Sequence, residues 1–120
     1  MLVAIHHQPL PMESLWLDGL GLRNGPALLS LLAGHPHARV VIWGHVHQES
    51  DRLRGHLRLL STPSTCAQFT PRTVNCVMDT RPPGFRRLEL DRHGNVRTEV
   101  VWLEDWILQG RPPDSRVMKR

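Results

Sequence analysis

The stretch VVIWGHVHQES, Val40–Ser50, is a short apolar run that stops at a glycine and continues into two histidines, His45 and His47. Four consecutive apolar residues, 40–43, indicate a strand covered on both faces, as in the parallel sheets of α/β proteins. Open α/β sheets bind ligands beyond the carboxyl ends of their strands, which is where these histidines stand. Alternation along an extended chain places residues i and i+2 on the same side. The sequence therefore predicts that both imidazoles reach toward one point, as in a metal site.

Composition alone does not single out this pair. The chain has 8 His in 120 residues, so about 0.5 His-x-His pairs are expected by chance. A second pair, His35 and His37 in GHPHAR, follows the helix-stopping Gly34 and flanks Pro36, which predicts an exposed turn. Position just past a strand is what makes His45 and His47 the candidates.

The start of the chain, VAIHHQPLP, has the same design. Residues 2–5 (LVAI) predict a short buried strand that ends at His6. Adjacent His6 and His7, followed by prolines, cannot both lie in a core. If both strands belong to one sheet, His6 lies on the same rim as His45 and His47, and the three side chains converge from two strand ends.

The remaining pattern predicts one helix followed by strands. The helix begins at Pro26, carries an apolar leucine face and ends at Gly34, after a glycine-rich loop over 12–24. The predicted later strands are 56–60, 73–78, 85–90 and 96–103, and the last two are joined by a hairpin turn over 91–95. The final apolar residues, Trp102, Trp106, Ile107 and Leu108, are expected to pack the end of the last strand or a short terminal helix. The fold class is α/β (α+β), with two strand-ended metal motifs followed by mostly antiparallel strands.

Composition bounds the function classes. With 40% hydrophobic and 22% charged residues, the chain has the profile of one globular domain. The absence of an 18-residue apolar window and of signal-peptide features favours a cytoplasmic protein without membrane contact. Cys66 and Cys76 lack metal or redox spacing, which indicates reduced structural thiols, although one disulfide stays open.

The basic charge is concentrated at the end of the chain. Residues 111–120 hold four basic side chains and one acid, which leaves 11 basic and 10 acidic residues in 1–110. A proline-rich basic end is typical of a disordered tail, so we expect a domain over 1–110 and a disordered tail over 111–120. The sequence does not interleave aromatic and basic residues in the way that nucleic-acid-binding proteins do, so no nucleic-acid partner is predicted.

Taken together, the motifs resemble a known superfamily. Val3-x-x-His6, continued as HHQP, and Gly44-His45-x-His47 resemble the last two metal-binding blocks of the calcineurin-like metallophosphoesterases. The stretches LRNGPALLSLLA, HQE and STPSTCAQF resemble more narrowly the bacterial 3′,5′-cyclic AMP phosphodiesterases of that superfamily. The resemblance runs from Met1 to about Leu103 and implies the C-terminal portion of an αββα sandwich.

The resemblance implies specific roles. His6 and His45 match ligands of the second metal of a binuclear centre. His47 matches a ligand of the first metal that lies close to the phosphate, which makes it the catalytic and substrate-binding candidate. His7 matches a position that does not contact metal directly. The implied cofactors are two divalent ions (Fe, Mn or Zn) in the complete enzyme, the implied substrate is cyclic AMP, and this chain is expected to bind about one ion through His6, His45 and His47.

The family's earlier blocks, Asp-x-His, Gly-Asp and Gly-Asn-His, do not occur ahead of His6. Asp91-Arg92-His93 spells the first of them, but its residue types suit the hairpin turn. The chain therefore resembles the C-terminal half of an enzyme, and the isolated chain is expected to be inactive. The alternative is a metal-binding or self-associating fragment, because the sheet needs the N-terminal half or a second copy to cover it.

Overall fold

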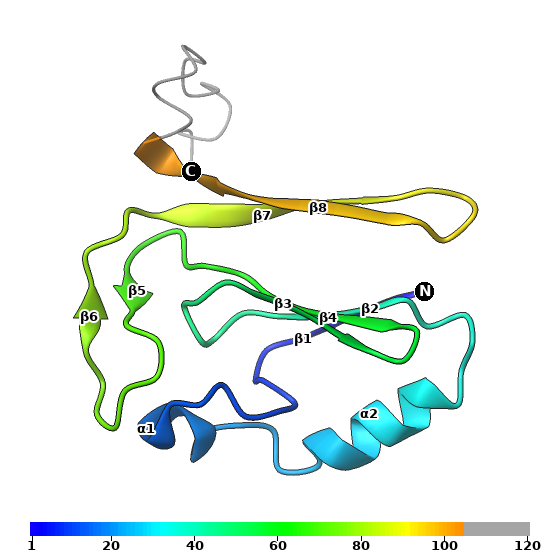
Figure 1. Ribbon diagram of the computed structural model, residues 1–120, viewed down its shortest axis with the longest axis horizontal. Helices are drawn as coiled ribbons and strands as arrows, with labels where there is room; N and C mark the ends of the chain where they lie inside the picture. Colours follow the sequence, from blue (N-terminus) through cyan, green and yellow to red (C-terminus); the bar gives the residue numbers. More distant parts are fainter. Residues whose placement is uncertain (105–120) are drawn as a thin grey trace.

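The computed structural model describes residues 1–104, which form three layers (Figure 1). A four-stranded sheet lies in the middle, two helices lie on one side of it, and a β-hairpin lies on the other. The elements are β1 (Leu2–Ile5), α1 (Leu15–Asp18), α2 (Gly25–Ala33), β2 (Val40–Trp43), β3 (Ser50–Arg54), β4 (Leu57–Ser61), β5 (Gln68–Phe69), β6 (Met78–Asp79), β7 (Gly84–Leu90) and β8 (Val96–Trp102).

The central sheet has the strand order β1-β2-β4-β3. β1 and β4 both run parallel to β2, and β3 runs antiparallel to β4. The predicted strands at 2–5 and 40–43 are confirmed, but β1 is half-buried, with Ala4 exposed, rather than buried as predicted. The continuous apolar run of β2 is explained by its central position between two layers. Among the described residues, β1 and β3 each have a partner strand on one side only.

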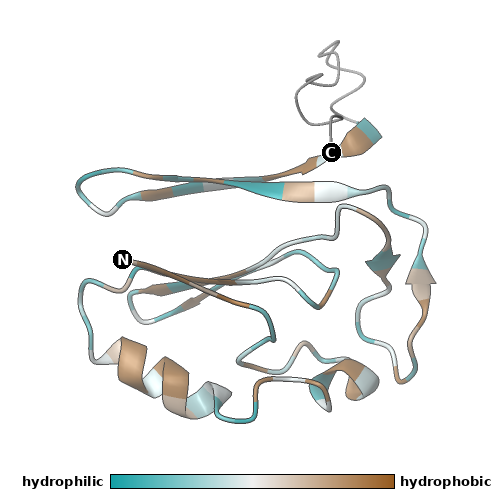
Figure 2. Ribbon diagram, turned by 180° about the vertical axis from the view of Figure 1, so that it is seen from behind, coloured by the Kyte–Doolittle hydropathy of each residue, from teal (hydrophilic) through white to brown (hydrophobic). Residues whose placement is uncertain are grey.

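The hydrophobic core fills the space between the sheet and the helices. Strand alternation sends Val41 and Trp43 of β2 toward α1 and α2, where they meet Leu17 and Leu29. The apolar residues of β1, β2 and α2 stand out by hydropathy in Figure 2. Because Trp43 is 1% exposed at the last position of β2, the backbone that carries the Gly44–His47 motif leaves the sheet from a tightly packed point.

The β7–β8 hairpin is held on the opposite face by arginines. Arg86 donates to the carbonyl oxygens of Ser61 (2.9 Å) and Ser50 (3.1 Å). Arg58 of β4 donates to the Val96 carbonyl (3.1 Å) and forms a two-pronged pair with Asp51. Charged donors to carbonyls are the stronger class of protein hydrogen bond, so these contacts fix the hairpin over the sheet.

Several sequence-based boundaries were wrong. The predicted strand 73–78 is a loop except at Met78, because Arg72 turns the chain with a φ of 59° and donates its amide to the Ser14 hydroxyl. The predicted loop over 12–24 contains α1, and β3 and β5 were not predicted. The strand predicted at 56–60 is β4, one residue later.

The other predicted elements are confirmed. The helix after Gly25 is α2, and the last two strands are β7 and β8 with their hairpin turn. The expectations for Trp106, Ile107 and Leu108, and for the tail over 111–120, lie outside the described residues. No helix within residues 1–104 has the length and apolar character needed to cross a membrane.

Candidate metal centre

Parallel pairing brings the two histidine motifs to the same rim of the sheet. Ile5, the last residue of β1, is in register with Trp43, the last residue of β2. His6 therefore follows its strand at the same level as Gly44 follows β2. The expected meeting of the two motifs at neighbouring carboxyl strand ends is confirmed for His6 and His45, whose ring centroids are 5.0 Å apart.

Three imidazoles form the cluster: His6, His7 and His45. One ring nitrogen of each lies within 4.8 Å of those of the others. The ring centroids of His6 and His7 are 4.8 Å apart, and those of His7 and His45 are 4.5 Å apart. His6 and His7 are exposed, whereas His45 is partly buried. The resemblance implied that His7 does not contact metal directly, but the structure places His7 in this group.

The partly buried member of the cluster, His45, is suited to bind a cation. Nε2 of His45 is buried and has no hydrogen-bond partner among the described residues. Burial holds the pKa of His45 below its ordinary value, and repulsion from the neighbouring imidazoles, His7 first, acts in the same direction. A neutral ring with a free nitrogen lone pair is the form of histidine that binds metal. The residues present therefore fit a divalent transition metal.

The reason for the arrangement differs from the one predicted. His45 and His47 are not on an extended strand: their φ angles are 61° and 49°, in the left-handed region that non-glycine residues rarely adopt. The amide of Val46 donates to the Gly44 carbonyl at 2.6 Å, which makes a tight turn. Val46, which stands between the two histidines in the sequence, is fully buried. Strain of this kind clusters at functional sites, where surrounding packing maintains it.

His47 lies outside the three-histidine cluster and is held by its own contacts. Its Nδ1 is 2.8 Å from the Ala67 carbonyl oxygen. Because a carbonyl only accepts, Nδ1 carries the proton and Nε2 is left as the free lone pair. The ring of Phe69 stacks on the imidazole, with centroids 4.4 Å apart and planes 8° from parallel. The Phe69 amide also donates to the His47 carbonyl at 3.3 Å.

Residues 61–69, whose contacts the sequence left open, support this motif. The Ser61 hydroxyl donates to the Gln48 carbonyl at 2.7 Å and bonds to the Ser50 hydroxyl at 2.8 Å. The fully buried Gln68 binds the Ser64 backbone through both ends of its amide, at 2.7 and 2.8 Å. These hydrogen bonds hold the segment, called the strap below, beside His47, which it contacts through the Ala67 carbonyl and the Phe69 ring. A polar stretch without a metal-ligand pattern carries no local signal of that role.

Histidines and acids elsewhere have structural roles. His35 and His37 are exposed in the turn after α2, as predicted. Asp91 accepts the amides of His93 and Asn95 at 2.8 and 2.9 Å inside the hairpin turn, so Asp91-x-His93 is a turn motif, also as predicted. Cys66 and Cys76 are free, which agrees with the predicted reduced thiols, but both are exposed, so the structural role that was predicted for them is wrong.

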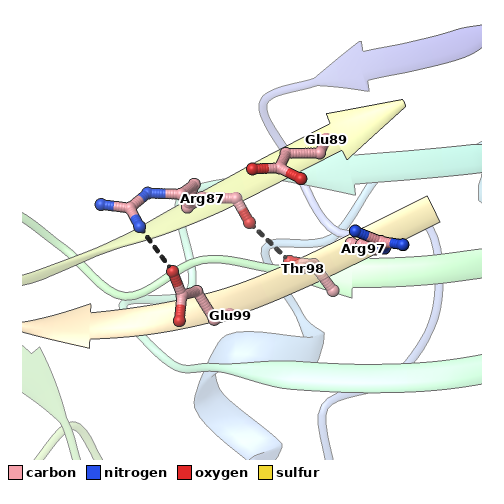
Figure 3. Close-up of a pocket in the computed structure, with 5 residues that line it drawn as sticks. All are labelled: Arg87, Glu89, Arg97, Thr98 and Glu99. Atoms are coloured by element: carbon pink, nitrogen blue, oxygen red, sulfur yellow. Dashed lines mark hydrogen bonds and ion pairs between the residues drawn. The ribbon is translucent and has the colours of Figure 1, made fainter. Parts of the chain in front are cut away.

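A surface hollow on the hairpin carries no histidine (Figure 3). Its residues come from β7 and β8 and include Arg87 and Glu99, which form a cross-strand ion pair at 2.7 Å. Alternating charges facing one another across two strands stabilise a hairpin. We assign this hollow to the hairpin's own stability.

The stacking contact leads to a prediction about the His47 tautomer. In Phe69→Ala the imidazole loses its stacking partner and can leave the Ala67 carbonyl, so we expect a fixed Nδ1–H tautomer to become a mixture of both tautomers. Long-range proton–nitrogen NMR spectra of the chain in a chelator measure this directly. Phe85→Ala, at a 42% exposed position on the hairpin, is the matched control. An unchanged His47 pattern in Phe69→Ala would show that the stack does not orient the ring.

Three known proteins are similar to most of this chain. The chain is 46% identical over 109 residues to the 3′,5′-cyclic adenosine monophosphate phosphodiesterase CpdA of Pseudomonas aeruginosa, covering 91% of this chain and 40% of that protein. It is 47% identical over 114 residues to CpdA of Escherichia coli K12, covering 95% of this chain and 40% of that protein. A 3′,5′-cyclic-nucleotide phosphodiesterase of Nostoc is 36% identical over 99 residues, or 82% of this chain and 37% of that protein.

No family model matches the chain. The chain spans about two fifths of the length of the curated relatives it matches. The resemblance predicted from Val3-x-x-His6 and Gly44-His45-x-His47 is confirmed: nearly the whole chain is homologous to one part of the bacterial 3′,5′-cyclic AMP phosphodiesterases.

Proposed function

We propose that this chain is the C-terminal portion of a calcineurin-like metallophosphoesterase domain, an αββα sandwich that hydrolyses the 3′ phosphoester of 3′,5′-cyclic AMP to give 5′-AMP. The observation that carries the proposal is the meeting of the His6 and His45 motifs at one rim of the sheet. Relatives with 46% and 47% identity over this region are named as cyclic AMP phosphodiesterases. Cyclic AMP is therefore the proposed substrate, and the cytoplasm the proposed location.

In the complete enzyme, His6 and His45 would hold one metal ion, and His47 would serve the other ion and the phosphate. The free Nε2 of His45 and the fixed orientation of His47 support these assignments. Fe and Zn suit imidazole ligands and Mn suits carboxylate and water ligands, and two ions of Fe, Mn or Zn are the proposed cofactors. When bound, paired divalent ions activate the attacking water and neutralise charge on the phosphoryl oxygens.

The chain's own contribution is orientation. The Ala67 carbonyl and the Phe69 ring hold His47 with Nε2 free, so this nitrogen can face the phosphoryl group or its metal without first breaking a hydrogen bond. The Ser61 hydroxyl, at the start of the strap, donates to the Gln48 carbonyl directly after the strained 44–47 turn and helps to hold that turn in place. A preorganised group of this kind needs no rearrangement when charge develops at phosphorus.

A second reading is a catalytically incomplete fragment that binds metal or associates with itself. One observation favours it: within residues 1–104 the cluster that fits a metal contains imidazoles and no carboxylate. A carboxylate bridge is what offsets the repulsion between two close cations. Three imidazoles suit one ion.

The enzymatic proposal is tested by identifying the product of cyclic AMP hydrolysis. The part of the Pseudomonas relative that precedes its aligned region is placed ahead of Met1, and the fused protein is incubated with cyclic AMP and Mn²⁺. We expect 5′-AMP by chromatography, formed only with metal. Accumulation of 3′-AMP, or turnover unaffected by a chelator, would contradict the proposal.

A further inference from the structure

The Phe69 ring, which stacks on His47, has a second aromatic neighbour in α1. The ring of Trp16 meets it at a right angle, with centroids 5.1 Å apart and planes 89° from parallel. Edge-to-face contact is one of the arrangements that aromatic pairs favour. We propose that Trp16 is a positioning residue, whose indole holds the Phe69 ring against the His47 imidazole and so keeps that imidazole oriented with Nε2 free. The role in the reaction rests on the proposed phosphodiesterase function, whereas the role in orienting His47 does not.

The helix α1 is attached to the loop between β5 and β6, which lies next to it in Figure 1. The Leu15 amide donates to the Thr73 carbonyl at 3.1 Å, and the Trp16 Nε1 donates to the Thr73 hydroxyl at 3.4 Å. That hydroxyl donates in turn to the carbonyl of Thr70, the residue after Phe69, at 3.2 Å. Thr73 therefore ties both the backbone of α1 and its indole to the segment that directly follows the strap.

The hydroxyl of Ser14 serves this attachment instead of its own helix. Ser14 is the N-cap of α1, where a serine hydroxyl commonly accepts an amide of the first helical turn. Here it makes no such bond, and it accepts the amides of Arg72 at 2.9 Å and Thr73 at 3.4 Å. Ser14 is fully buried, so these bonds are protected from water. Because a four-residue helix has little stability of its own, α1 depends on this contact with the loop.

The backbone is strained on both sides of this contact. Glu13 and Arg72 have φ angles of 64° and 59°, in the left-handed region that non-glycine residues rarely adopt. Their side chains form an ion pair at 2.8 Å, but both are more than half exposed, and exposed pairs contribute little stability. The ion pair therefore does not account for the strain. Strained backbone persists where its surroundings maintain it, and here the buried Ser14 contact joins the two turns that bring Trp16 to Phe69.

The stack on His47 needs this second contact. Phe69 is only partly buried and ends β5, a strand of two residues, so the sheet alone does not fix its ring. Without the indole, the ring can turn away and leave the imidazole without its stacking partner. Small misplacements of an acting group can lower a rate by about 10²-fold. Because the bond from His47 Nδ1 to the Ala67 carbonyl can still form, we expect a smaller loss, of about tenfold.

The first measurement is the His47 tautomer in Trp16 variants of the 120-residue chain, read from long-range proton–nitrogen NMR spectra in a chelator. Trp16→Ala and Trp16→Leu are expected to give a mixture of tautomers. Trp16→Leu keeps apolar volume against the core, so a role in packing alone would leave its spectrum unchanged. Trp16→Phe keeps an aromatic ring and should retain the Nδ1–H form. Leu15→Ala, at a 71% exposed position of α1, is the matched control, and the amide signals of β2 check the fold in each sample.

The second measurement is the kinetics of the fused protein. Trp16→Leu should lower kcat by about tenfold and leave KM within about twofold, because a misdirected His47 weakens contacts made in the transition state. Trp16→Phe should restore kcat to within about threefold of the unaltered value. A single Nδ1–H tautomer in Trp16→Leu, or equal losses in Trp16→Phe and Trp16→Leu, would overturn the proposal. If the fused protein with Trp16 intact releases no 5′-AMP, the hydrolase proposal and the role in the reaction both fail, and the NMR spectra still decide whether Trp16 orients His47.

Discussion

The 120-residue chain alone is expected to hydrolyse cyclic AMP at least about a thousandfold more slowly than the same chain fused to the upstream part of a relative. The physical reason is the ligand set. Two ions need a bridging carboxylate, and the cluster within residues 1–104 offers only imidazoles. The measurement compares kcat/KM of the two proteins at saturating Mn²⁺.

The fused protein also carries the control. His47→Ala should lower its kcat by about 10²–10⁴-fold, as expected for loss of a group that acts on the phosphoryl centre. His93→Ala, in the hairpin turn, should leave kcat unchanged. Metal-dependent turnover by the unfused chain that disappears in His47→Ala would show that these 120 residues contain a complete set of ligands.

The second large effect concerns the edge of the sheet. β1 pairs with β2 on one side, and among the described residues nothing pairs with its other side. An apolar edge strand with unpaired backbone groups recruits other strands. We expect the isolated chain, of 13.7 kDa, to scatter light as a dimer or larger species, and the fused protein to be monodisperse. Amide exchange should be faster in β1 than in the central strand β2.

A lysine introduced on one edge strand at a time shows which of the two open edges, β1 or β3, associates. Ala4→Lys, at an exposed position of β1, should reduce self-association, because an edge lysine disfavours pairing. Leu53→Lys, at a 77% exposed position on the opposite edge strand β3, is the matched control. If only Leu53→Lys produced monomers, β3 would be the associating edge. A monodisperse monomer with strong protection over 2–5 would instead identify a self-sufficient domain.

The sequence predicted the elements whose signals are local. The apolar runs of β1 and β2 and the Pro-to-Gly bounds of α2 needed no long-range information. The strand predicted over 73–78 failed because Ser14, 59 residues from Thr73 in the chain, accepts the amide of Thr73, its first residue, together with that of Arg72. Propensity gives way where a distant side chain offers the backbone a better partner.

The candidate site divides in the same way. The sequence by itself determined that His6 and His45 follow two apolar strands, since residue order and apolar runs are local properties. Only the tertiary structure decided that these strands are parallel neighbours, that His7 joins the cluster, and that His45 and His47 take positive φ angles. Only it places Ala67, 20 residues from His47, where its carbonyl selects the tautomer. These features depend on packing between segments far apart in the chain, which holds a strained turn that no local preference would choose.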